Sequence, residues 1–275
     1  MRGTLRKLLA TLGHPVEYQL SLGGQEGEGI SLNPLIGKQI ALEHTGRILC
    51  LGCKALTKKS FSQGYCYRCF ITLARCDMCI MKPEICHFSK GTCREPEWAQ
   101  AFCFQPHYVY LANSSGVKVG ITRQDQIPTR WIDQGAVQAL PILKVPSRQI
   151  SGLVEVELAK YVSDKTSWQQ MLKNNVEFVD LHAKRDELLA NCAMALDGLR
   201  QCFGLDALAL LPDEALVDIS YPVDQYPVKV KSFNLDATPK IEGILHGVKA
   251  QYLLLDTGVI NIRKFSGYEV DFSWL

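Results

Sequence analysis

The sequence predicts an α+β protein in which a cysteine-rich segment precedes an α/β region and a region of short strands. Nine of the 11 cysteines lie between Cys50 and Cys103. Residues 108–162 alternate between short β-prone runs and helical segments. Residues 221–271 contain apolar runs broken by turn residues, which is typical of a small antiparallel sheet or partial barrel. These patterns divide the chain into 1–49, 50–107, 108–200 and 201–275.

Composition excludes several classes of protein. Hydrophobic residues make up 47% of the chain and the net charge is +2, as in ordinary folded proteins. No apolar run reaches the about 18 residues of a membrane span, and the N-terminal residues lack the apolar core of a signal peptide. We therefore expect a cytoplasmic protein without a membrane partner. The basic excess falls in 50–107, with eight Lys and Arg against four Asp and Glu.

The first 49 residues predict a short helix followed by a strand. Residues 4–12 have helical character, and a Gly- and Glu-rich turn occupies residues 23–29. Residues 37–49 then read as a strand whose Ile40, Leu42 and Ile48 face a core.

Two cysteine pairs with metal-ligand spacing follow this strand. Cys50 and Cys53 are two residues apart, as are Cys66 and Cys69, and 12 residues separate the pairs. Two such turns close a tetrahedron of thiolates around one zinc ion, which makes a structural site. An iron–sulfur cluster also accepts four thiolates, and four buried reduced cysteines are the alternative without a metal.

A third pair, Cys76 and Cys79, predicts a second metal site. Two of the residues that follow would complete it: Cys86, His87, Cys93, Cys103 or His107. We favour Cys86 and Cys93, which gives about two zinc ions per chain at four ligands per site. Cys192 and Cys202 lie apart from the cluster, where we expect core or surface thiols.

The region from residue 108 predicts the order ββαβα. Runs 108–112 and 117–122 form a hairpin across the Asn-Ser-Ser-Gly turn. Pro128 suits the first turn of a helix, and residues 139–145 form a third strand. A second helix follows, with Ser151 as its expected N-cap.

This region resembles the GIY-YIG nuclease domain. The two signature triplets of that family align with residues 108–110 and 118–120, its arginine with Arg130 and its glutamate with Glu155. The resemblance implies that Tyr110 assists the attacking water, that Arg130 neutralises charge on the phosphate, and that Glu155 holds Mg²⁺ or Mn²⁺. It also predicts that these side chains converge with Lys118 on one concave face.

The chain departs from the GIY-YIG pattern at two positions. Tyr108 replaces the leading glycine of the first triplet, and Lys118 replaces the tyrosine of the second. Lys118 acts as a base only if its pKa falls far below about 10.4, and as an ammonium it binds phosphate instead. Lys118, Arg123 and Arg130 are therefore the candidate nucleic-acid contacts, for DNA or RNA.

A wider resemblance, to the domain-of-unknown-function family 2797, spans most of the chain. The segments that carry it are GYCYRCF (64–70), CDMCIMKPEICHF (76–88), GTCREPEW (91–98), KVGITR (118–123), RWIDQGA (130–136) and GVKAQYLLLDTGVINIRKFSGY (247–268). This resemblance implies no reaction.

Three functions compete on these observations. The first is a zinc-binding, metal-dependent nuclease. The second is a catalytically inactive nucleic-acid-binding protein. The third is a zinc-organised scaffold for a protein partner, in which Arg130 merely pairs with Asp133 or Asp125. The C-terminal region has a net charge of −4, from six basic and ten acidic residues, and we expect it to be a packing module.

Overall fold

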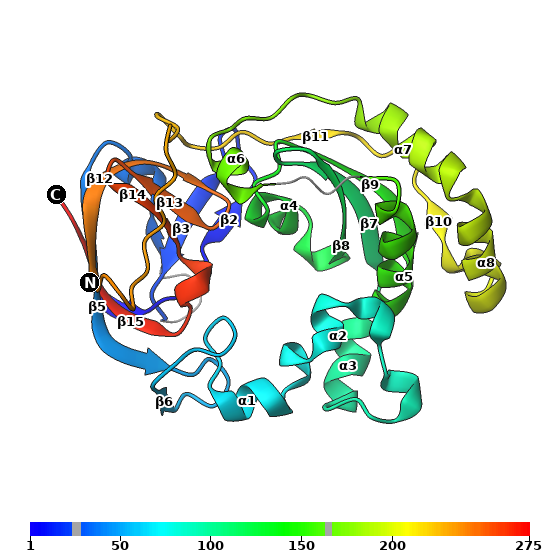
Figure 1. Cartoon of the computed structure of the whole chain (residues 1–275), viewed down its shortest axis with the longest axis horizontal. Coiled ribbons are helices and arrows are strands. Elements are labelled where there is room, and N and C mark those ends of the chain that lie inside the picture. The colour runs from blue at the N-terminus through cyan, green and yellow to red at the C-terminus, as the bar shows by residue number, and fades with distance from the viewer. Residues whose placement is uncertain (24–28, 163–166) are drawn as a thin grey trace.

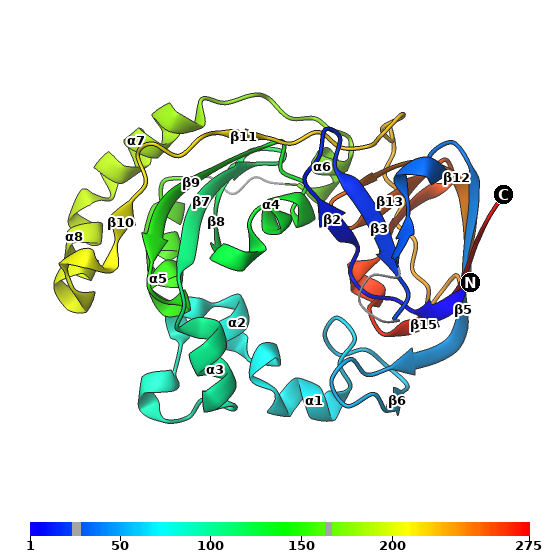
Figure 2. The ribbon, with the colours of Figure 1, turned by 180° about the vertical axis from the view of Figure 1, so that it is seen from behind.

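The computed structural model of the chain describes residues 1–23, 29–162 and 167–275. Within them it contains a seven-stranded, a five-stranded and a three-stranded sheet, together with short helices, so the α+β prediction is confirmed. The two larger sheets lie on opposite sides of the molecule (Figure 1), and the cysteine-rich segment runs between them along one side, as the view from behind also shows (Figure 2).

The seven-stranded sheet joins the two ends of the chain. Its long central strand β5 (Gln39–Leu49) pairs with β12 (Lys240–Lys249) on one side and β15 (Tyr268–Trp274) on the other. Residues 1–49 and 201–275, which the sequence divides into separate regions, therefore share one sheet. Its other strands are β1 (Arg2–Thr4), β6 (Leu56–Thr57), β13 (Tyr252–Leu255) and β14 (Gly258–Asn261).

The helix predicted over residues 4–12 is wrong. The chain forms β1 and β2 (Leu9–Thr11) there, and β2 continues into a small sheet with β3 (Glu17–Ser21) and β4 (Gly29–Ser31). The N–H of Leu5 donates to the carbonyl of Tyr268, and that of Arg6 to the carbonyl of Ser21. Hydrogen bonds to distant strands thus outweigh local helix propensity.

The five-stranded sheet and its helices follow the predicted ββαβα order. β7 (His107–Asn113) lies between β9 (Gln138–Val145) and β8 (Val117–Arg123), which forms the edge. Two short strands pair with β9: β10 (Ala209–Leu210) and β11 (Val217–Asp218). The helices of this part are α4 (Thr129–Asp133), α5 (Arg148–Ala159), α6 (Trp168–Leu172), α7 (Leu181–Asn191) and α8 (Ala193–Phe203).

Successive residues of β7 face different cores. Tyr110 and Ala112 pack with Trp131 of α4 and with the seven-stranded sheet. Val109 and Leu111 pack with α5, α7 and α8 on the opposite face. The N-cap of α5 is Ser147, whose Oγ accepts from the Ile150 N–H, and not the predicted Ser151, which lies one turn inside the helix.

The cysteine-rich segment has short helices and little apolar core. It contains α1 (Tyr67–Thr72), α2 (Met78–Met81) and α3 (Pro96–Cys103), joined by single turns of 3-10 helix. Between residues 50 and 103 the buried hydrophobic side chains are small ones: Cys50, Cys69, Ala74 and Ala99. So few contacts give little folding free energy, and bound metal is the usual source of the remainder.

Candidate functional site: a four-cysteine centre and a cationic groove

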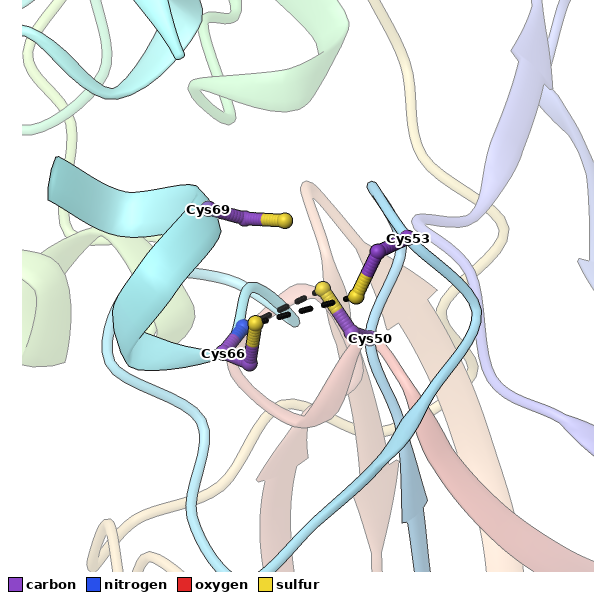
Figure 3. A group of neighbouring side chains, drawn as sticks. All are labelled: Cys50, Cys53, Cys66 and Cys69. Atoms are coloured by element: carbon purple, nitrogen blue, oxygen red, sulfur yellow. Dashed lines mark hydrogen bonds between the residues drawn. The ribbon is translucent and has the colours of Figure 1, made fainter. Parts of the chain in front are cut away.

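Four cysteines form a compact cluster between β5 and α1. Cys50 and Cys53 lie in the turn after β5, where Lys54 takes a left-handed backbone (φ 64°). Cys66 precedes the first turn of α1 and Cys69 lies within it, so a helix and a turn present two thiols each. Their Sγ atoms all lie within 4.8 Å of one another and point into a common centre (Figure 3).

The cluster has the dimensions of a zinc site. The Sγ atoms of Cys53 and Cys66 are 3.8 Å apart. A tetrahedron with Zn–S bonds of about 2.3 Å has edges of about 3.8 Å. These four thiols can therefore surround one Zn²⁺ ion, as the spacing of the two pairs predicts.

Backbone N–H groups stabilise a thiolate in this cluster. The Cys66 N–H donates to Sγ of Cys50 at 3.2 Å. Burial opposes ionisation of Cys50, but the N–H groups of Cys66, Cys53 and Gly52 outweigh it and lower the pKa of this thiol to about 6. Burial, followed by the neighbouring thiols, raises the pKa of Cys69 to about 12. Burial and neighbouring thiols thus oppose ionisation of the whole cluster. A divalent cation would overcome this opposition, because it stabilises all four thiolates together.

The other predicted ligands separate into different surroundings. Asp77, Cys79 and His87 form a second group whose ligand atoms lie within 4.8 Å of one another. His107 is fully buried at the start of β7 and its Nδ1 lies 2.7 Å from the Gln105 carbonyl oxygen. Cys192 is buried between α7 and α8, whereas Cys202 is exposed, in agreement with a core and a surface thiol.

A cationic groove of about 300 Å³ lies where the cysteine-rich segment meets β8, α4 and α5. Its charged walls hold five basic and two acidic side chains: Lys7, Arg123, Arg130, Arg148, Arg263, Asp133 and Glu155. Its other walls are Ile80, Met81, Pro83, Phe102, Ile121, Thr122 and Gln126. The formal charge of these walls is +3, so the groove favours anions.

Arg130 and Glu155 meet around the edge of the five-stranded sheet. They come from α4 and α5, which pack on opposite faces, and both line the groove beside the edge strand β8. Burial raises the pKa of Glu155 to about 7, although Arg130 and Arg148 oppose this rise. The carboxyl group is thus poised to lose its proton near neutral pH, or on binding a cation.

Tyr110 is fully buried and lies close enough to Arg130 to interact with it. Its ring packs over Gly120 of β8, where an added Cβ would lie 2.6 Å from Cζ of the tyrosine. Its hydroxyl donates to Oε1 of Gln134 at 3.0 Å. Burial raises the pKa of Tyr110 to about 12, although Arg130 opposes this. The phenol therefore keeps its proton at neutral pH and can serve as a donor rather than a base.

The remaining predicted contacts lie on β8. Lys118 pairs across the strands with Ala112 and is close enough to Glu155 to lower the pKa of that carboxyl. Arg123 lies in the groove wall, with its guanidinium 4.1 Å from the ring centre of Phe102 and 3.3 Å from a carboxylate oxygen of Asp125.

In the described part of the chain, Arg130 forms no ion pair with Asp125 or Asp133, the partners expected if its role were only structural. Within the described part of the chain, Asp125 pairs with Arg123, and Asp133 pairs with Lys7 at 3.1 Å. Asp133 also accepts from Nε2 of Gln251 at 2.8 Å. Both carboxylates are therefore engaged elsewhere.

Sequence reasoning missed three cationic residues of the groove: Lys7, Arg148 and Arg263. Burial lowers the pKa of Arg148 and of Arg263, and Arg130 lowers both further. Arg263 belongs to a region of net negative charge, and Lys7 to the N-terminal strands, so neither had a local signal. Arg148 had one, since it opens the helix that carries Glu155.

Residues 37–270 match the family described as "Protein of unknown function (DUF2797)". The chain belongs to this family. This match agrees with the wider resemblance seen in the sequence, and it assigns no activity to the chain. No curated protein and no solved structure matches the chain. Among the helices that the structure describes, none combines the length and apolar character needed to cross a bilayer.

Proposed function

We propose that this DUF2797 protein binds the phosphodiester backbone of nucleic acid in the cationic groove. The observation that carries the proposal is the gathering of Arg130 from α4, Arg148 from α5 and Arg263 from the distant C-terminal region. Arg130 lowers the pKa of both Arg148 and Arg263, so an anion placed among these guanidinium groups relieves their repulsion. Guanidinium groups also match phosphate oxygens in geometry.

Glu155 supports metal-dependent hydrolysis as the reaction of this groove. A carboxyl group among arginines, with a pKa near neutrality, can hold Mg²⁺ or Mn²⁺ against a bound phosphate. Arg130 and Arg148 would then stabilise negative charge on the phosphate during the reaction. Tyr110, which stays protonated, would position Arg130 through its hydroxyl. The GIY-YIG resemblance implies the same roles for Arg130 and Glu155, whereas it has Tyr110 assist the attacking water and does not include Arg148.

Binding is tested first, with labelled single- and double-stranded DNA and RNA at several salt concentrations. We expect Arg130→Ala to weaken affinity about tenfold and Arg130→Lys to weaken it less, because lysine keeps the charge but loses the planar fork. Each lost phosphate contact should also lower the slope of log affinity against log salt by about 0.7 to 0.9. Arg200→Ala is the matched control, since Arg200 pairs with Asp197 at 2.7 Å on α8.

Hydrolysis is tested separately with Mg²⁺ or Mn²⁺. Glu155→Gln should abolish cleavage and spare binding, because it removes the metal ligand and leaves the cations. Binding without cleavage in the wild-type protein would favour the inactive nucleic-acid-binding protein. Equal affinity of the wild type and Arg130→Ala would favour the protein scaffold over both.

A further inference from the structure

A small cavity lies inside the cysteine-rich segment, apart from the four-cysteine centre. It measures about 20 Å³, and four of the side chains that line it are Cys79, Cys86, Cys93 and Cys103. A space of this size accepts about one water-sized sphere. It therefore suits a single ion and excludes an organic ligand.

Separate elements bring these four thiols to the cavity. Cys79 lies in α2, and Cys86 follows the 3-10 turn Pro83–Ile85. Cys93 comes two residues after Gly91, which turns the chain with a left-handed backbone (φ 70°). Cys103 is the last residue of α3. All four cysteines are half-buried.

The nearby carboxylate and imidazole are already engaged in holding this segment together. Asp77 Oδ2 accepts from Nε of Arg94 at 2.7 Å and lies 3.5 Å from Nε2 of His87. Its Oδ1 accepts from the Cys79 N–H and caps α2. Nδ1 of His87 lies 2.7 Å from the hydroxyl oxygen of Thr92. These contacts fix the loops around the cavity and leave the thiols as its available ligands.

Cys76 is not among the residues that line the cavity, although Cys79, its partner in the C-x2-C pair, is.

We propose that Cys79, Cys86, Cys93 and Cys103 bind a second zinc ion, and that Asp77, His87 and Arg94 support this site without ligating the metal. Four thiolates and Zn²⁺ carry a formal charge of −2, and Arg94, Arg123 and Arg148 lie nearby to balance it. Binding draws Cys86, Cys93 and Cys103 inward from the cavity walls, in the manner of sites that form as the metal binds.

The site would also brace one wall of the cationic groove. Ile80 and Met81 of α2 line that groove, and an Nη of Arg148 donates to the Ile80 carbonyl. Arg148 thus spans the distance between the thiols and the groove. The metal site itself does not depend on what the groove binds.

The ligand set is tested by zinc analysis of the full-length protein and two cysteine variants. The wild type should contain about two zinc ions per chain. Cys103→Ser should lose one of them, and the matched control Cys76→Ser should keep both. Loss of zinc in Cys76→Ser with retention in Cys103→Ser, or a wild type with one zinc ion, would overturn the proposal.

Cobalt substitution of the wild type answers the same question without variants that could misfold. If the second site has four thiolates, the second equivalent of Co²⁺ should add about as much near-ultraviolet thiolate-to-cobalt absorption as the first. If Asp77, Cys79 and His87 hold the ion instead, it should add about a quarter as much, since one thiolate replaces four, and Asp77→Asn should then lose the metal.

Discussion

Glu155 should make the stability of this protein fall as pH rises toward neutrality. Its pKa is 4.5 when exposed and about 7 in the folded protein, mainly through burial. Between these values the folded state keeps a proton that the unfolded state has lost, so stability is full below pH 4.5 and declines through pH 7. A tenfold difference in proton affinity is worth about 1.4 kcal/mol, so the whole effect reaches about 3 kcal/mol.

Glu155→Gln removes this titration and mimics the protonated acid. The free energy of unfolding of the variant, relative to the wild type, should therefore increase by about 2 to 3 kcal/mol between pH 5 and pH 8. Urea unfolding at several pH values measures it, with Mg²⁺ and Mn²⁺ absent. Adding either ion at pH 8 should then stabilise the wild type and leave the variant unchanged if Glu155 holds the metal.

Glu157→Gln is the matched control for this experiment. Glu157 lies on the same helix and pairs with Lys160 at 2.6 Å on the solvent side. Its removal should produce a small offset that does not vary with pH over this range. A pH-independent difference for Glu155→Gln, or the same pH profile in both variants, would refute the placement of Glu155 in a desolvated groove.

Three further perturbations test other parts of the molecule. Gly120→Ala should lower the free energy of unfolding by about 1 to 3 kcal/mol because the new methyl displaces the Tyr110 ring. Gly198→Ala on α8 is the control, since a Cβ added there meets no atom within 4 Å, and it should be neutral or stabilising in the same urea assay. Chelation of zinc should lower the melting temperature and expose residues 50–103 to protease, and Cys53→Ser should do the same while the exposed Cys202→Ser does not. Lys249 is fully buried, and burial lowers its pKa to about 7. Lys249→Met should therefore be more stable than the wild type at pH 7, by a margin that shrinks toward pH 10 as the lysine of the unfolded wild type loses its proton.

The four-cysteine centre could be predicted from sequence because its information is local. Two C-x2-C turns supply both halves of the site, and one short helix and one strand end position them. The role of the third pair, Cys76 and Cys79, as metal ligands stays a prediction. Cys79 lines the small cavity of the cysteine-rich segment and Cys76 does not, a difference that the C-x2-C spacing alone cannot report.

The groove could be predicted only in part because most of its walls come from distant segments. Arg130, Glu155 and Arg123 lie within one ββαβα run, and the order of strands and helices in this run was enough to predict that they lie near one another. Lys7 and Arg263 reach the same groove only because the sheet of both chain ends packs against α4. The nuclease resemblance and the catalytic roles of Tyr110 and Lys118 stay predictions until binding and cleavage are measured.

The pairing of β5 has a consequence for synthesis on the ribosome. Its long partners β12 and β15 come from residues 240–249 and 268–274, which follow the end of β5 by 191 and 219 residues. While the intervening chain is being made, β5 stays without these neighbours. It has 11 residues and includes the apolar Ile40, Leu42 and Ile48. Such an exposed edge invites pairing with other chains. The nascent protein should therefore depend on chaperones until its final strand emerges, and truncations that remove β15 should aggregate rather than fold into a smaller domain.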